Sequence, residues 1–102
     1  MGAEGDRPVT DREIEQLREW AAAHNEEALL ADGFEDAFIG MAQRCGQPVL
    51  AVYDIDLAIA VLMKRDGMDY DGAEECLAFN TLGAWAGEMT PLFLKRYEKD
   101  ET

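Results

Sequence analysis

The sequence contains no serine, one histidine and two cysteines among its 102 residues. Nucleophilic and acid–base catalysis usually relies on one of these side chains beside a partner that moves its proton. His24 lies at the predicted end of a helix beside acidic residues, and neither Cys45 nor Cys76 has a base close to it in sequence. We therefore predict no catalytic residue and no enzyme. A Ser-His-Asp or Cys-His site is excluded unless His24 folds back onto a cysteine.

The sequence also lacks long apolar runs and paired cysteine spacings. No run approaches the ~20 residues of a membrane helix. The first ten residues, MGAEGDRPVT, have neither the positive start nor the apolar stretch of a signal peptide. Two distant cysteines are typical of reduced thiols in a cytosolic protein. These features predict a cytoplasmic protein with no membrane partner.

Basic residues are scarce, with 9 Lys and Arg against 22 Asp and Glu and a net charge of −13. Phosphate-binding surfaces need clustered cations, and only Lys64-Arg65 and Lys95-Arg96 cluster here. Direct binding of nucleic acid is therefore not expected. The acidity has two interpretations: it keeps a small protein in solution, or it offers a negative surface to a basic partner. One form of the second interpretation is a nucleic-acid mimic that occupies a basic DNA- or RNA-binding groove.

Acidic clusters raise the question of a metal or a small ligand. Asp69, Asp71 and Gly72 fall in the order of a calcium loop, but the first and twelfth ligand positions fall on Gly67 and Ala78, which carry no carboxylate. No glycine-rich phosphate loop or dinucleotide fingerprint is present. We predict no metal and no cofactor.

A small-ligand binder remains as an alternative function. It would use a carboxylate site in which Asp32, Glu35 and Asp36 meet Asp54 and Asp56. Helix-capping and turn roles already explain most of these residues.

We predict one domain over residues 10–97, between a disordered lead (1–9) and a solvated tail (98–102). Thr10-x-x-Glu13 is a capping box that starts a helix ending at about Ala23, and a short helical turn is expected over 26–31. Two apolar runs then predict a β-hairpin. These strands cover residues 37–43 and 48–53, with a loop at 44–47. Gly40 inside the first strand indicates either a bulge or a closely approaching backbone.

Asp54 caps the next predicted helix, whose residues 57–63 are all apolar. Such a helix should be covered on more than one side. Gly67 supplies its left-handed end, and Asp69 or Asp71 caps a third helix. A last strand is expected over residues 92–95, after Thr90-Pro91. The order α-β-β-α-α-β predicts an α+β fold: a small antiparallel sheet, made of the hairpin and the C-terminal strand, with helices packed on one face.

Several motifs occur here in a specific order: DGF, YD, DGM, FN, GAW and GE-x-TP. This order resembles a family of small acidic proteins common in phage and prophage genomes. The resemblance covers about residues 27–94, and the family has no established activity. It implies a viral or prophage context and supplies no mechanism. The matching positions are Asp32, Gly33, Phe34, Gly40, Tyr53, Asp54, Asp66, Gly67, Met68, Phe79, Asn80, Gly83, Trp85, Gly87, Glu88, Thr90 and Pro91.

The stretch from Ala78 to Leu94 carries a single charge, Glu88, in a chain that is 30% charged. Core packing and partner binding both explain this neutrality. Phe79, with Leu82 and Ala86, forms a second apolar side of the third helix. Trp85 is either a core residue or an interface anchor; we predict a partly buried indole that shares an apolar patch with Met89. Asn80 either satisfies a strand backbone or faces a partner.

The interaction site predicted from this stretch consists of Asn80, Trp85, Glu88, Met89 and Thr90. The predicted function is protein–protein interaction by a small phage-type accessory protein, with a host or defence component as partner. A homodimer is left open.

Overall fold

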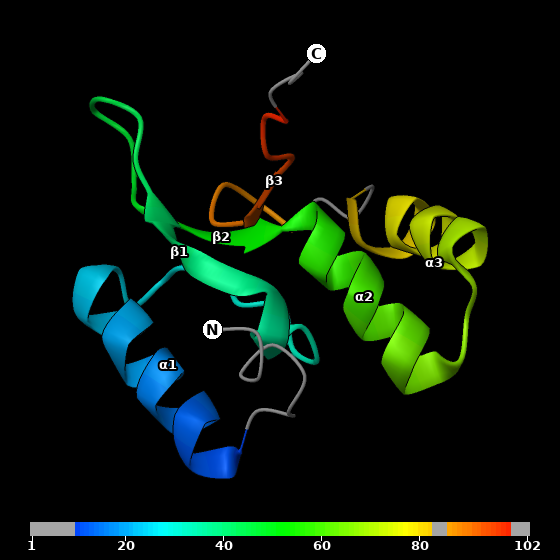
Figure 1. Cartoon of the computed structure of the whole chain (residues 1–102). Coiled ribbons are helices and arrows are strands. Elements are labelled where there is room, and N and C mark those ends of the chain that lie inside the picture. Colours follow the sequence, from blue (N-terminus) through cyan, green and yellow to red (C-terminus); the bar gives the residue numbers. More distant parts are fainter. Residues whose placement is uncertain (1–9, 83–85, 99–102) are drawn as a thin grey trace.

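The computed structural model describes residues 10–82 and 86–98 (Figure 1). Within them the chain forms three α-helices and a three-stranded mixed sheet in the order α-β-β-α-α-β, as predicted for an α+β fold. The elements are α1 (Asp11–His24), the 3-10 turn η2 (Glu35–Ala37), β1 (Phe38–Ala42), β2 (Leu50–Asp54), α2 (Ile55–Asp66), α3 (Tyr70–Leu77), the π-helical turn η3 (Ala78–Leu82) and β3 (Leu92–Leu94).

Helix α1 begins with the predicted capping box. The Glu13 backbone N–H donates to Thr10 Oγ1 at 3.2 Å, and the Thr10 N–H donates to the Glu13 carboxylate at 3.0 Å. The helical turn expected over 26–31 is wrong. Asn25 ends the helix and accepts from the Glu27 N–H through its side chain at 3.0 Å, and this local bond competes with continued helix. A 3-10 turn occurs later, at η2.

The predicted hairpin is confirmed, and so is the bulge, the first of the two alternatives for Gly40. Strands β1 and β2 pair antiparallel, with Phe38 opposite Tyr53 and Gly40 opposite Val52. Ile39 therefore has no counterpart on β2, which is the geometry of a β-bulge. Gly40 has φ 147°, a conformation that side-chain-bearing residues rarely adopt.

The prediction of a purely antiparallel sheet is wrong, because β3 runs parallel to β2. Val52 lies opposite Leu92, and Asp54 lies opposite Leu94. The chain leaves the end of β2, passes through α2 and α3, and returns in the same direction. A crossover that contains helices is the usual way to connect parallel strands. The strand is also shorter than expected and ends at Leu94.

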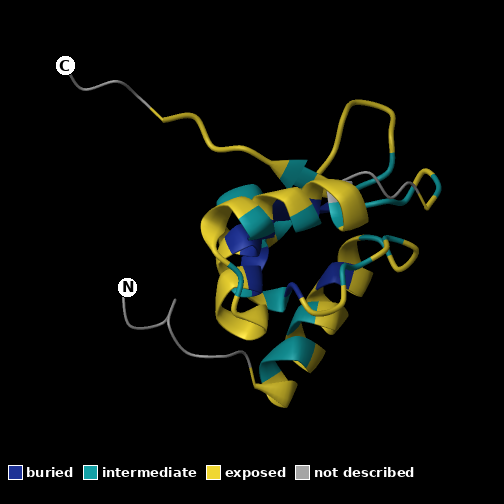
Figure 2. Cartoon of the chain, turned by 90° about the vertical axis from the view of Figure 1, so that its right-hand side faces the viewer, coloured by how far each residue is buried: buried dark blue, intermediate teal, exposed yellow. Residues whose placement is uncertain are grey.

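The core lies between the sheet and the helices. Phe38, Tyr53 and Phe93 are neighbours across the three strands, and the ring centroids of Tyr53 lie 5.5 Å from those of both other residues. Figure 2 shows the buried residues gathered inside the molecule, with exposed residues on the outer sides of the helices. The buried cluster consists of Phe34, Ala37, Ala51, Tyr53, Ala58, Ile59, Leu62, Ala73 and Leu77.

Helix α2 is less enclosed than its all-apolar sequence predicted. Ala58, Ile59 and Leu62 are buried, but Leu57 and Met63 are 39% and 37% exposed. At 100° per residue, the three buried residues cover one arc of the helix, and Leu57 and Met63 flank this arc on its two sides. The predicted ends are confirmed: Asp54 caps the first turn, and Gly67 takes the left-handed conformation with φ 69°. In α3 the capping residue is Asp69.

Candidate functional site

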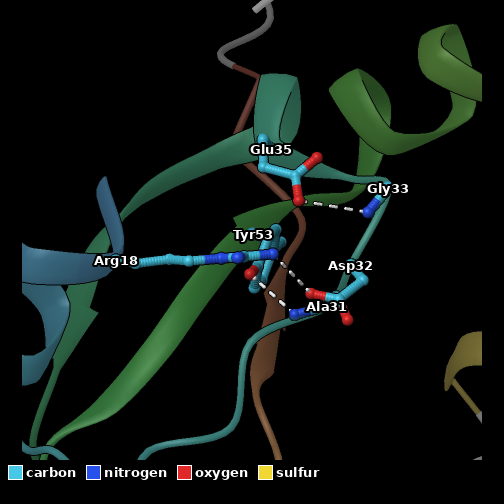
Figure 3. A network of polar contacts seen from close by, with 6 residues as sticks. All are labelled: Arg18, Ala31, Asp32, Gly33, Glu35 and Tyr53. Atoms are coloured by element: carbon cyan, nitrogen blue, oxygen red, sulfur yellow. Dashed lines mark hydrogen bonds and ion pairs between the residues drawn. The ribbon is translucent and has the colours of Figure 1, made fainter. Parts of the chain in front are cut away.

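A polar network surrounds the hydroxyl of the buried Tyr53 (Figure 3). The Ala31 backbone N–H donates to this hydroxyl at 2.8 Å, and Arg18 of α1 pairs with Asp32 at 3.4 Å. Glu35 accepts from the Gly33 N–H at 3.2 Å. Burial raises the pKa of Tyr53, and the neighbouring charges of Glu35 and Asp32 act in the same direction. The network ties α1 and the 31–37 segment to the middle strand, which is a structural role.

Two members of the predicted carboxylate site, Asp54 and Asp56, each form an ion pair with a basic residue that follows β3. The nearly inaccessible Asp54 accepts from the Leu57 N–H at 3.0 Å and from Arg96 Nε at 2.7 Å. Asp56 pairs with Lys95 at 3.0 Å, and this carboxylate raises the pKa of Lys95.

The other proposed members, Asp32, Glu35 and Asp36, belong to the segment around η2. No group of three or more His, Cys, Asp or Glu residues in the described part of the chain is placed to hold a metal ion. The carboxylates that are bonded therefore hold turns, helix ends and β3.

The remaining chemically reactive side chains are His24 and the two cysteines. The His24 ring packs against Trp20 in a tilted arrangement, with 4.4 Å between ring centroids, and its Nδ1 lies 2.9 Å from the Trp20 carbonyl oxygen. Cys45 is an exposed free thiol in the hairpin loop, and Cys76 is a half-buried free thiol on α3.

The predicted interaction residues Glu88, Met89 and Thr90 lie in the loop before β3. The Met89 carbonyl accepts from the Leu29 N–H at 3.1 Å, and its sulfur lies 3.5 Å from Asn25 Nδ2. Thr90 Oγ1 donates to the Gly87 carbonyl at 2.6 Å. Met89 and Thr90 are half-buried and fasten the loop, whereas Glu88 is exposed. The expectation for Trp85, including its shared patch with Met89, lies outside the described residues.

Asn80 is exposed and lies in the π-helical turn η3. Its side-chain amide donates to the Cys76 sulfur, one turn earlier, at 3.3 Å. The first alternative for Asn80, satisfaction of a strand backbone inside the fold, is therefore wrong. The second alternative, contact with a partner, stays a prediction.

Phe79 is the residue that sequence reasoning missed. The sequence predicts that it belongs to an apolar side of the third helix, yet it is 77% exposed. It follows Asp71 and Glu75 at steps of four residues, and all three are exposed. This spacing places them along one side of the helix. The signal in the sequence is the spacing itself, which puts Phe79 in line with two acidic residues. We call Asp71, Glu75 and Phe79 the Phe79 face.

The Phe79 face ends in the π-helical turn η3, which contains Phe79 itself. The N–H of Ala78 is shared between the carbonyls of Glu74 and Glu75, where α3 passes into η3. Turns of this kind are inserted in helices frequently at functional sites.

Comparison with known protein families, with curated protein sequences and with solved structures finds no match for this chain. No described helix has the length and hydropathy needed to cross a membrane. The surface of the molecule itself therefore carries the evidence for its function.

Proposed function

We propose that the protein acts by binding another protein through the Phe79 face. The observation that carries this proposal is the 77% exposure of the Phe79 side chain at the end of an acidic helix side. Water around an aromatic ring is released when the ring enters an apolar pocket, so aromatic side chains contribute strongly to interfaces. The resemblance to phage and prophage proteins supports a host or defence component as the partner.

The chemistry of the Phe79 face defines the partner surface that fits it. Phe79 requires an apolar pocket. Asp71 and Glu75 require basic side chains on one side of that pocket, because complementary charge guides the approach and fixes the orientation. Asn80 adds an amide beside the ring and can exchange hydrogen bonds at the rim. The expected partner therefore presents an apolar pocket with Lys or Arg along one edge.

Affinity capture from a bacterial lysate, with the tagged full chain as bait, tests this proposal. Phe79→Ala should abolish capture of the specific partner. Tyr97→Ala is the matched control, because Tyr97 is an even more exposed aromatic residue, at 88%, outside the Phe79 face. Both variants should keep the wild-type circular dichroism spectrum. A partner that binds wild type and Phe79→Ala equally well contradicts the proposal.

The net charge of −13 supports a second candidate, a nucleic-acid mimic. Such a protein would bind through its carboxylates, and its affinity would fall steeply with added salt. Comparison of the double variant Asp71→Asn with Glu75→Gln against Phe79→Ala distinguishes the two candidate functions. A mimic should lose its partner in the double variant and keep it in Phe79→Ala. If Phe79 is an aromatic anchor, Phe79→Ala should weaken partner binding more than the double variant does.

We also infer that the helices lie on one face of the sheet. Trp20 of α1 contacts Phe38, and the buried residues of α2 and α3 share the core cluster with Tyr53, the sheet partner of Phe38. Leu92 and Leu94 alternate with Phe93, which packs against the core cluster, so they point to the other face. We place the activity in the cytoplasm, because both cysteines are free thiols.

A further inference from the structure

We propose that β3 is a self-association strand, which pairs antiparallel with β3 of a second copy of this chain. The sheet order is β1-β2-β3, so within the described residues β3 has a neighbour on one side only. An edge strand presents unpaired N–H and C=O groups that accept another strand. This inference concerns a surface separate from the Phe79 face and stands independently of the proposed partner.

The side chains of β3 make its edge suited to a strand. Leu92, Phe93 and Leu94 carry no charge, and the two leucines are 44% and 42% exposed. The other edge strand, β1, is interrupted by the bulge at Ile39 and Gly40, and bulges discourage pairing with further strands. The regular edge of the sheet is therefore the one formed by β3 (Figure 1).

A two-fold axis at Phe93 makes this pairing self-complementary. Leu92 of one copy then lies opposite Leu94 of the other, and the reverse pair forms on the far side of the axis. Four leucines come together on the face of the sheet opposite Tyr53 and Phe93. Such cross-strand pairs lie about 4.5–5.5 Å apart. The strand is only three residues long, so these leucines, rather than the few backbone hydrogen bonds, must supply most of the affinity.

The charges next to β3 fit a second copy. Lys95 and Arg96 are already paired with Asp56 and Asp54 of their own chain. In the two-fold arrangement Lys95 lies opposite Pro91 and Arg96 opposite Thr90, so no two cations face one another. The long-range repulsion between two chains of charge −13 remains, and salt screens it. Self-association should therefore strengthen with added salt, whereas binding of a basic partner to the Phe79 face should weaken.

Sedimentation velocity over a concentration series, at 50 mM and 500 mM NaCl, measures this self-association. We expect a monomer–dimer equilibrium that shifts toward dimer at high salt. The double variant Leu92→Gln with Leu94→Gln should weaken it by about a hundredfold, because four half-exposed leucines lose their apolar burial. The matched control combines Leu29→Gln with Leu57→Gln, which are 40% and 39% exposed elsewhere. A monomer at every concentration and salt, or a dimer unaffected by the β3 variant, overturns the proposal.

A crosslinking experiment tests the register. In a background with Cys45→Ala and Cys76→Ala, Leu92→Cys and Leu94→Cys are prepared as separate proteins. Only their mixture should form an intermolecular disulfide under mild oxidation, because position 92 faces position 94 of the other copy and the cysteines must come within disulfide reach. Crosslinking of either protein alone to the same extent, or none in the mixture, contradicts the two-fold antiparallel pairing.

Discussion

Removal of Arg96 should destabilise the protein although the side chain itself is largely exposed. Arg96 Nε lies 2.7 Å from Asp54, and the side chains of these residues are 61% and 2% exposed, respectively. Asp54 keeps its bond from the Leu57 N–H in the variant. The other carboxylate oxygen, however, remains buried without its cation. The loss of stability in Arg96→Ala therefore comes mainly from the buried Asp54 carboxylate, which is left without a cation, and not from lost packing of Arg96.

The expected magnitude lies between two limits. Exposed ion pairs contribute about 0.2–1 kcal/mol, and breaking a fully buried pair costs about 3–5 kcal/mol. Because one partner is solvated and Asp54 retains a second bond, we expect Arg96→Ala to lower the free energy of unfolding by about 1–2 kcal/mol. A domain of this size has a total stability of about 5–10 kcal/mol. The Tm should fall by about 5–15 °C.

Urea unfolding followed by circular dichroism measures this loss, and a double-mutant cycle assigns it. In an Asp54→Ala background no buried carboxylate remains, so Arg96→Ala should then cost less than about 0.5 kcal/mol. Lys95→Ala is the neighbouring control and should cost clearly less than Arg96→Ala, because both Lys95 and Asp56 are partly solvated. An Arg96→Ala variant as stable as wild type, or an equal loss in both backgrounds, would refute the reasoning.

Two further predictions concern the core. Tyr53→Phe should cost about 1 kcal/mol at pH 7, because the Ala31 N–H loses its acceptor. Since the pKa of Tyr53 is raised, the unfolded chain loses its tyrosine proton first as the pH rises above about 10. Wild-type stability should therefore decline above pH 10, and Tyr53→Phe should decline less in urea titrations at each pH; an identical decline contradicts this. Leu62→Ala should cost about 2–5 kcal/mol and Met63→Ala less than about 1 kcal/mol, because Leu62 is 3% and Met63 37% exposed; similar losses in thermal unfolding contradict the burial assignment.

Local sequence signals were sufficient for much of the fold. The Thr10 capping box, the Asp54 cap and the Gly67 end each depend on residues within one turn of one another, so their chemistry is visible in a short window. The sequence also indicated the bulge at Gly40, because a glycine within an apolar strand often marks a bulge. Features decided by neighbours close in sequence were predicted correctly.

Features decided by distant neighbours were not predictable. Nothing within β3 itself distinguishes parallel from antiparallel pairing with β2, since the outcome depends on how α2 and α3 pack between the two strands. The apolar run of α2 likewise could not show that Leu57 and Met63 remain uncovered. Among the described residues, α3, η2 and β2 pack against this helix and leave these two side chains partly uncovered.

The candidate site was also not predictable from the sequence, because neutral residues that serve the fold and neutral residues that are exposed look the same there. Residues 78–94 were treated as one neutral stretch with two explanations, core packing and partner binding. The structure gives different parts of the stretch different environments: Met89 and Thr90 fasten a loop, Phe93 packs on Tyr53, and Phe79 projects into solvent. The packing of Phe93 and the loop contacts of Met89 and Thr90 explain these three residues through the fold alone. The fold leaves the apolar character of Phe79 unexplained, so Phe79→Ala should change binding while leaving the stability of the monomer nearly unchanged.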